Sequence, residues 1–255
     1  MKKICYVIIC VWGLAACQSS GVPKLSAQKA EKSADIHYQI GINSLYSGNL
    51  PKAFDELMTA NRVRPNQPKI LDALAYAWRL RGNTSKAEEM YRASLAAQST
   101  PSTETNYGSL LIALKRYHEA EVHLRLALED PRYRNQYLAL INLGDALLGQ
   151  EQFTDAIKSY RQASMMNPHQ NIAKLHEAQA YIHVKRWNFA QALYESMLQQ
   201  NPSNRPALEG IIQVATALRQ PNIAKKHLGT YIEHEKAPLN RAWANDELVR
   251  LGQIR

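Results

Sequence analysis

Cysteine is scarce in this 255-residue chain, and its placement is informative. The three cysteines are Cys5, Cys10 and Cys17, so nothing after residue 17 can form a disulfide or a thiolate metal site. Glycine and proline, at 11 residues each, are too few for a collagen-like or low-complexity chain. No apolar run reaches the roughly 20 residues that a membrane-crossing helix requires. The composition therefore predicts a globular chain without disulfides or a transmembrane helix.

The charge balance is basic, with 31 Lys and Arg residues against 22 Asp and Glu and a formal net charge of +9. Such a balance alone suits nucleic acid, anionic lipid or an acidic partner. The basic residues are dispersed, however, and the longest clusters are pairs such as Lys115-Arg116. Because no basic block of five or six residues occurs, we expect no nucleic-acid partner.

The first sixteen residues have the three parts of a secretory signal peptide. Lys2 and Lys3 form a positive start, an apolar run extends over residues 4–14, and the small residues Ala15 and Ala16 follow. The run is too short to span a bilayer. We therefore expect residues 1–16 to be a signal peptide that is removed on export.

The end of this signal, Leu14-Ala15-Ala16-Cys17, resembles the bacterial lipobox. The resemblance implies that Cys17 becomes the first residue and carries a diacylglyceryl group and an amide-linked acyl chain. Gln18 follows instead of the Asp that retains such lipoproteins in the inner membrane, which implies the outer membrane. The alternative is a plain secreted protein in which Cys17 follows the cleavage site by chance. Residues 17–33, rich in Ser, Lys, Ala and Gln, are expected to be the lipidated cysteine and a polar tether.

From Ala34 onward a small residue is followed, twelve positions later, by an alanine. The six pairs are Gly41 and Ala53, Ala75 and Ala87, Gly108 and Ala120, Gly144 and Ala156, Ala178 and Ala190, and the weaker Ile212 and Ala224. The offset within a pair is constant, whereas the step between pairs varies from 33 to 36 residues. Small residues let two helices cross closely, so we expect helical hairpins with insertions between the units.

This register resembles the tetratricopeptide repeat, a helix-turn-helix of 34 residues. Its best copy here contains Leu143, Gly144, Ala156, Tyr160 and Pro168. The resemblance implies an all-α fold, a right-handed superhelix of about six units with a capping helix at its C-terminal end. The expected units are 34–67, 68–100, 101–136, 137–170, 171–204 and 205–237, followed by the cap at 238–255. The sixth unit departs from the pattern at Ile212.

No residue pattern for catalysis or metal binding is found. His176 and His183 are seven residues apart, about 10 Å along a helix, which is too far for one zinc ion. Phosphate-binding loops, His-Glu-x-x-His and nucleophile elbows are also missing. Tyr91, Tyr160 and Tyr194 occupy the packing position of the repeat, so we expect them in the core. The chain is predicted not to be an enzyme and to need no cofactor beyond the covalent lipid on Cys17.

In the tetratricopeptide pattern, the fifth, ninth and twelfth positions of each unit face the concave groove. The candidate partner-binding residues in the first three units, with one neighbour, are Tyr38, Ile42, Leu45, Asp72, Tyr76, Arg79, Asn106 and Ser109. The Lys, Asn and Arg set that holds a chain-terminal carboxylate is missing. A largely apolar groove suits an amphipathic helix or an extended segment of a partner protein. The alternative for each residue is burial between repeats.

The third unit contains Asn106-Tyr107-Gly108 and the run 115–120, Lys-Arg-Tyr-His-Glu-Ala. With the lipidation signal, the tether and six repeats, it resembles the PilF/PilW-type pilotin lipoproteins of type IV pilus biogenesis. The resemblance implies an outer-membrane protein on the periplasmic face that binds secretin subunits and promotes their localisation and multimerisation. It implies a secretin partner, a membrane contact through the acyl anchor, and a monomer when free.

Two other functions stay open from the sequence alone. A lipidated scaffold of another envelope machine, such as outer-membrane barrel assembly or peptidoglycan-synthesis control, would carry the same anchor and repeats. An enzyme would require a catalytic group that no motif reveals, together with a cleft containing strongly shifted titrating residues.

Overall fold

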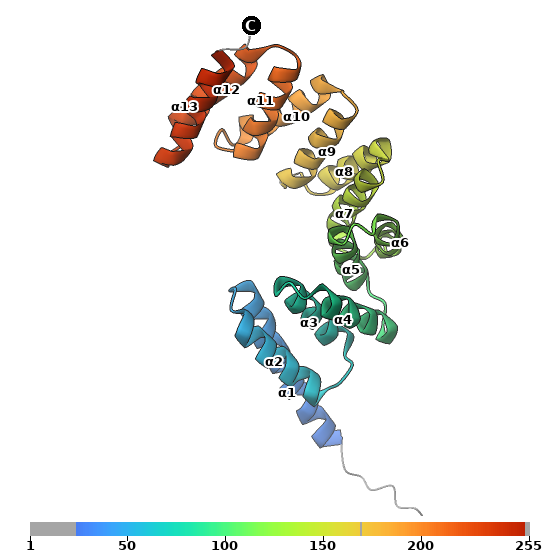
Figure 1. The fold of residues 1–255 in the computed structure, drawn as a ribbon. Helices are drawn as coiled ribbons and strands as arrows, with labels where there is room; N and C mark the ends of the chain where they lie inside the picture. The colour runs from blue at the N-terminus through green and yellow to red at the C-terminus, as the bar shows by residue number, and fades with distance from the viewer. Residues whose placement is uncertain (1–23, 169, 253–255) are drawn as a thin grey trace, which may run out of the picture.

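The computed structural model describes residues 24–168 and 170–252, and in these ranges it contains thirteen α-helices and no strand (Figure 1). The helices are α1 (Lys24–Tyr46), α2 (Leu50–Val63), α3 (Pro68–Leu80), α4 (Thr84–Ala97), α5 (Pro101–Ala113), α6 (Tyr117–Leu128), α7 (Gln136–Gly149), α8 (Phe153–Met166), α9 (Asn171–His183), α10 (Trp187–Gln200), α11 (Arg205–Ala217), α12 (Pro221–His234) and α13 (Pro238–Gly252). The all-α fold class is confirmed. The predicted signal peptide, Cys17 and residues 253–255 of the predicted cap lie outside the described residues.

Consecutive helices pair into six helix-turn-helix hairpins, from α1 with α2 to α11 with α12, and α13 packs on α12. Helices α3, α5, α9 and α11 begin at the first residues of the units expected from the sequence. Proline lies in the first turn of α2, α3, α5, α11 and α12. Backbone N–H groups at this position have no acceptor within the helix, so the N–H that proline lacks costs no hydrogen bond. Asparagine side chains cap three helix starts, at Asn49, Asn83 and Asn204.

The turn inside each hairpin has the same backbone geometry. One residue per turn has a positive φ of 55 to 81°, and these residues are Gly48, Gly82, Lys115, Glu151, Lys185 and Arg219. The next residue donates its backbone N–H to a carbonyl five positions earlier at 2.8 to 2.9 Å, which is the helix-ending Schellman bond. The constant turn explains the constant offset within each unit of the sequence.

The two helices of a hairpin cross at the small residue of each pair. A Cβ added at Gly108 would lie 2.7 Å from Leu124 Cγ, and one added at Gly144 would overlap the ring of Tyr160. Leu124 and Tyr160 are fully buried, as are Tyr91, Tyr194 and Leu228 at the matching position of their units. The prediction that Tyr91, Tyr160 and Tyr194 belong to the core is confirmed.

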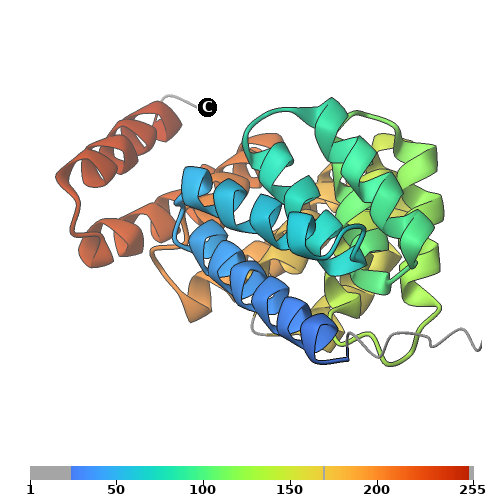
Figure 2. The same ribbon diagram turned by 90° about the horizontal axis from the view of Figure 1, so that it is seen from below.

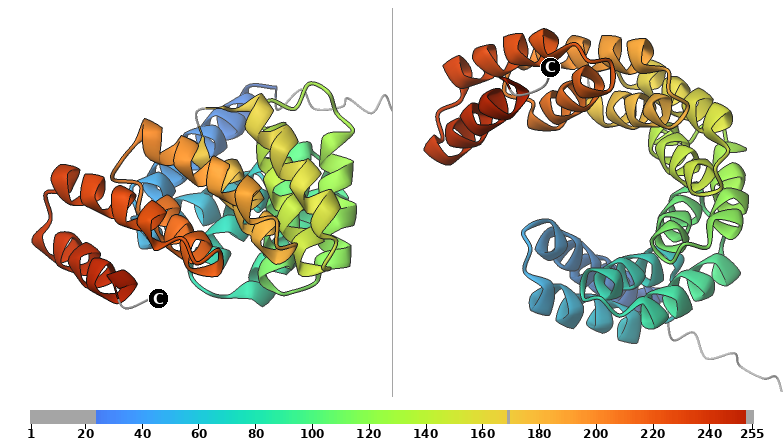
Figure 3. Two further views of the ribbon diagram at one scale, coloured as in Figure 1. Left: turned by 90° about the horizontal axis from the view of Figure 1, so that it is seen from above. Right: turned by 45° about the horizontal axis from the view of Figure 1, so that its top comes forward.

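The hairpins follow one another around a superhelix, so that the described residues form an open arc (Figures 2 and 3). Each first helix contacts the first helix of the next unit, from α1 with α3 to α9 with α11. In the described part of the chain, the second helices of successive units make no comparable contact. Elements on the inside of a curve lie closer together than those on the outside. The first helices therefore line the concave side of the arc.

The first helix is longer than expected, which corrects one predicted boundary. The polar tether was expected to extend over residues 17–33, but α1 already begins at Lys24. Residues 24–33 contain Ala, Lys, Gln and Glu, which are strong helix formers. Arg64 Nη1, just after α2, also holds Glu31 Oε1 at 2.9 Å. A polar composition therefore did not distinguish a tether from an exposed helical turn.

Within residues 24–168 and 170–252, none of the helices combines the length and apolar character needed to cross a bilayer. In the same ranges, no three His, Cys, Asp or Glu side chains gather as a metal ion would require.

Candidate protein-binding groove

The eight groove residues predicted from the sequence lie on α1, α3 and α5, three neighbouring helices of the concave side. All eight are partly buried. Tyr38, Ile42 and Leu45, on α1, pack against the buried cluster formed by Phe54, Leu57 and other residues of the first two units. Much of their apolar surface therefore stabilises the N-terminal hairpins and is not available to a partner.

The polar groove residues of α3 and α5 contact one another directly. Asn106 Nδ2 donates to Asp72 Oδ1 and Oδ2 at 3.3 and 3.1 Å. Arg79 Nη1 donates to Ser109 Oγ at 3.0 Å, and its guanidinium lies 5.0 Å from the centre of the Tyr76 ring. These bonds connect the second and third units and fix the side chains that face the arc. The structure thus brings Asp72, Tyr76, Arg79, Asn106 and Ser109 into one polar and aromatic cluster, which we call the Asp72 cluster.

The electrostatic environment of Asp72 is unusual for a carboxylate. Burial raises the pKa of Asp72 above its ordinary value of 3.8, although hydrogen bonds from Asn106 and Thr103 oppose the rise. Burial also raises the pKa of Tyr38, Tyr91 and Tyr133, and the negative charge of Asp72 adds to the rise at each of them. The charge of Asp72 therefore acts on tyrosines from three different units.

The sequence did not predict that two tyrosines, Tyr133 and Tyr91, lie near Asp72. Tyr133 lies between α6 and α7, in the longer connection that separates the third and fourth units. It has no place in the repeat register, so no positional argument could select it. Tyr91 was correctly placed in the core, but its buried hydroxyl has no hydrogen-bond partner among the described residues. That missing partner depends on three-dimensional packing and leaves no signal in the sequence.

A second carboxylate on the concave side, that of Asp145, has both a tyrosine and a histidine as partners. Tyr160 donates its hydroxyl to Asp145 Oδ1 at 2.7 Å, and His176 Nδ1 lies 2.8 Å from the same oxygen. Tyr76 occupies in the second unit the position that Asp145 has in the fourth. The Tyr91 hydroxyl therefore lacks the acceptor that Tyr160 has.

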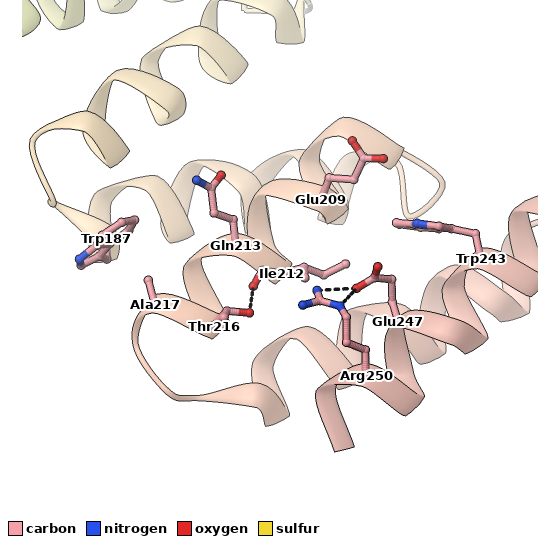
Figure 4. Close-up of a pocket in the computed structure, with 9 residues that line it drawn as sticks. All are labelled: Trp187, Glu209, Ile212, Gln213, Thr216, Ala217, Trp243, Glu247 and Arg250. Carbon is pink, nitrogen blue, oxygen red and sulfur yellow. Dashed lines mark hydrogen bonds and ion pairs between the residues drawn. The ribbon is translucent and has the colours of Figure 1, made fainter. Parts of the chain in front are cut away.

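A cleft of about 620 Å³ opens at the opposite end of the arc, between α11 and α13 (Figure 4). It is lined by Trp187, Glu209, Ile212, Gln213, Thr216, Ala217, Trp243, Glu247 and Arg250. Among the described residues, the first helices of successive units contact one another, but α13 makes no comparable contact with α11. Its charged groups are paired within the chain, Arg250 with Glu247 at 2.6 Å and Arg205 with Glu209 at 2.9 Å. The cleft therefore offers aromatic surface without an unpaired charge to select a ligand.

Comparison with known proteins identifies the architecture. Residues 137–170, which form α7, α8 and their turn, match the tetratricopeptide repeat family. The chain therefore contains a tetratricopeptide repeat within an all-α superhelix. The type IV pilus assembly protein PilF of Pseudomonas aeruginosa is similar to it, with 25% identity over 224 residues that cover 87% of this chain and 89% of PilF.

Two solved structures share this superhelical fold. Pseudomonas aeruginosa PilF matches with a TM-score of 0.71 and 24% identity, over 86% of this chain and 99% of its own. PilW, a widely conserved type IV pilus biogenesis factor, matches with a TM-score of 0.75 and 19% identity, over 86% of this chain and 98% of its own. The similarity therefore extends over most of the chain and is not confined to one repeat.

Proposed function

We propose that this tetratricopeptide-repeat protein is an outer-membrane lipoprotein that binds secretin subunits and promotes their localisation and multimerisation for type IV pilus biogenesis. The observation that carries the proposal is the similarity to PilF over most of both chains. The fold is compatible with it, because stacked repeats present a long concave surface that suits an extended or helical segment of another protein.

The Asp72 cluster is the part of the concave side that we propose contacts the partner. Its side chains are partly exposed and are held in place by bonds between units, so little conformational entropy is lost when a partner binds. The α1 residues Tyr38, Ile42 and Leu45 support the cluster from the neighbouring hairpin. Binding requires no chemical step, and we assign no catalytic residue.

The proposed anchor is the acylated Cys17. One acyl chain gives marginal membrane affinity, whereas several chains hold a protein durably, at about 0.8 kcal/mol per buried methylene. A subunit that binds the groove would travel with the lipoprotein to the outer membrane. There, confinement to a surface raises the local concentration of subunits and favours their assembly.

Equilibrium binding of purified secretin to the purified chain tests the proposal, with Tyr76→Ala as the groove variant. Tyr76 contacts Arg79 but is not part of the fully buried core, so the variant should fold. We expect saturable binding by the wild type and at least a tenfold weaker affinity for Tyr76→Ala. The matched control is Tyr46→Ala, because Tyr46 lies at the end of α1 with 88% of its surface exposed.

Absence of secretin binding by the wild type would contradict the proposal. If purified barrel-assembly or wall-synthesis proteins bound instead, the chain would belong to another envelope machine. Equal affinities for wild type and Tyr76→Ala would move the binding site away from the second unit.

A further inference from the structure

The acidic residues of the six concave helices follow a pattern with one exception. Six of them lie within 4 Å of a basic side chain: Glu31 with Arg64, Asp35 with Lys69, Glu104 with His123, Asp145 with His176, Glu177 with Arg161, and Glu209 with Arg205. The seventh is Asp72, on α3. In the part of the chain that the structure describes, no Lys, Arg or His forms an ion pair with it. Its hydrogen-bond donors are neutral: the amide of Asn106 and the side chain of Thr103.

An unpaired carboxylate in a half-buried position destabilises a protein, because burial removes water without supplying a compensating charge. Two basic residues on the same helix, Lys69 and Arg79, could compensate the charge of Asp72. Lys69 Nζ is instead 2.6 Å from Asp35 Oδ1, and Arg79 is bonded to Ser109 and stacked on Tyr76. Both cations therefore have other partners, and the carboxylate keeps an uncompensated negative charge.

The surroundings of Asp72 are those that attract a cation. Tyrosine rings bind ammonium and guanidinium groups through their negative faces, and two of the neighbouring rings already do so. Lys69 Nζ lies 5.1 Å from the centre of the Tyr38 ring, and Arg79 lies 5.0 Å from that of Tyr76. Tyr133 contributes a third ring from the connection between α6 and α7. The buried hydroxyl of Tyr91, which has no hydrogen-bond partner among the described residues, lies in the electrostatic field of both Asp72 and Arg79.

We propose that Asp72 is the receptor for a basic side chain, a lysine or an arginine, of the partner segment that binds the concave side. The inference rests on the proposed function, since it names the chemistry of the segment held at that site. The incoming cation supplies the basic partner that the fold itself supplies to the other six acidic residues. Asn106 orients the carboxylate, and the tyrosine rings surround the aliphatic stem of the basic side chain.

A double-mutant cycle tests this assignment. Purified secretin is measured against the full chain, its Asp72→Asn variant and a control, Asp55→Asn, which removes an exposed carboxylate from the outer helix α2. A panel of secretin variants, each with one Lys or Arg changed to Gln, is measured against the same three proteins. Asparagine has the shape of aspartate and can still bond to Asn106, so the variant should fold.

We expect Asp72→Asn to weaken secretin binding about tenfold or more, the usual loss for a charged hydrogen bond, while Asp55→Asn binds like the wild type. One secretin variant should bind the wild-type chain as weakly as unchanged secretin binds Asp72→Asn. The affinity of that secretin variant for Asp72→Asn should be no lower still, because both changes remove the same ion pair.

The two failures are distinguishable. If wild-type protein does not bind secretin at all, the proposed function fails. If secretin binds and Asp72→Asn has an unchanged affinity, or if every basic-residue variant remains additive with Asp72→Asn, the function stands and Asp72 is not the receptor.

Discussion

At the residue scale, the three consecutive residues Asn106, Tyr107 and Gly108 have different roles: the first faces the groove, and the other two pack the hairpin. Asn106 faces the groove and holds Asp72, whereas Tyr107 is buried and its hydroxyl donates to Glu88 Oε1 at 3.0 Å. Gly108 lies at the crossing with α6, where no Cβ fits. The repeat register predicts the places of Tyr107 and Gly108, whereas Asn106 is only a neighbour of the register's groove positions. The register could not predict the hydrogen bonds of Asn106, which depend on the arrangement of two helices from different units.

Gly144→Ala tests the close crossing of α7 and α8. The added Cβ overlaps the ring of Tyr160, which is fully buried and cannot move without disturbing the core. We expect the free energy of unfolding to fall by about 1–3 kcal/mol in urea denaturation. The control is Gly229→Ala on α12, where a Cβ meets nothing within 4 Å and helix propensity favours alanine by up to about 1 kcal/mol. Equal effects of the two changes would show that the crossing is not tightly packed.

The raised pKa of Asp72 gives a prediction about pH and stability. Burial disfavours the ionised carboxylate, so the folded-state pKa lies above 3.8 and ionisation destabilises the fold at higher pH. Asp72→Asn should therefore increase the free energy of unfolding at pH 7. The increase should disappear as the pH falls below 3.8, where Asp72 is neutral in both states. Loss of stability at pH 7 in the variant would show that the charge is already compensated.

Glu104→Gln is the contrasting variant. Burial alone would raise the pKa of Glu104, but hydrogen bonds from His123 and Ser99 outweigh it and lower the pKa below 4.5. Its ionised form therefore stabilises the fold above pH 4.5. Glu104→Gln should reduce stability at pH 7, and the loss should fade as the pH falls through the lowered pKa. The two variants are thus expected to change stability in opposite directions at pH 7.

At the element scale, the sequence predicts more than at the residue scale, because the hairpin is a repeated unit. The small residues, the alanines and the prolines were sufficient to place the helix starts near residues 68, 101, 171 and 205. The variable step between units was expected to reflect insertions between hairpins. The structure confirms this in the longer connection between α6 and α7. The start of α1 was predicted wrongly, since no register residue marks the additional turns before Ala34.

The shared turn geometry predicts which substitutions its backbone favours. Glu151 has a φ of 61°, a conformation that costs a residue with a side chain about 1–2 kcal/mol relative to glycine. Glu151→Gly should therefore raise the free energy of unfolding by up to about 1 kcal/mol, after the entropy gained by the unfolded chain is subtracted. Gly82→Ala should lower it by about 1 kcal/mol, because Gly82 has a φ of 81°. Thermal and urea denaturation measure both, and shifts of the opposite sign would mean that the turns are not strained.

At the scale of the whole molecule, the two proposed sites lie toward the same end of the chain. The proposed anchor is at the N-terminal end, and the Asp72 cluster lies on the second and third hairpins, near that end. Both assignments are predictions from local patterns of the sequence, the lipidation signal and the repeat register. The sequence could not predict the aromatic cleft between α11 and α13, because the cleft depends on how far the last helix stands from its neighbour.

The most direct test of the central claim measures secretin in cells, as monomers and as multimers in separated inner and outer membranes. Cells producing the wild-type chain, no chain, or Cys17→Ser are compared. With an acylated anchor and a secretin-binding groove, multimers should be abundant at the outer membrane only with the wild type. Cys17→Ser should leave a folded protein and mislocalised secretin that multimerises poorly. Normal secretin multimers at the outer membrane in the Cys17→Ser cells or in cells without the chain would contradict the claim.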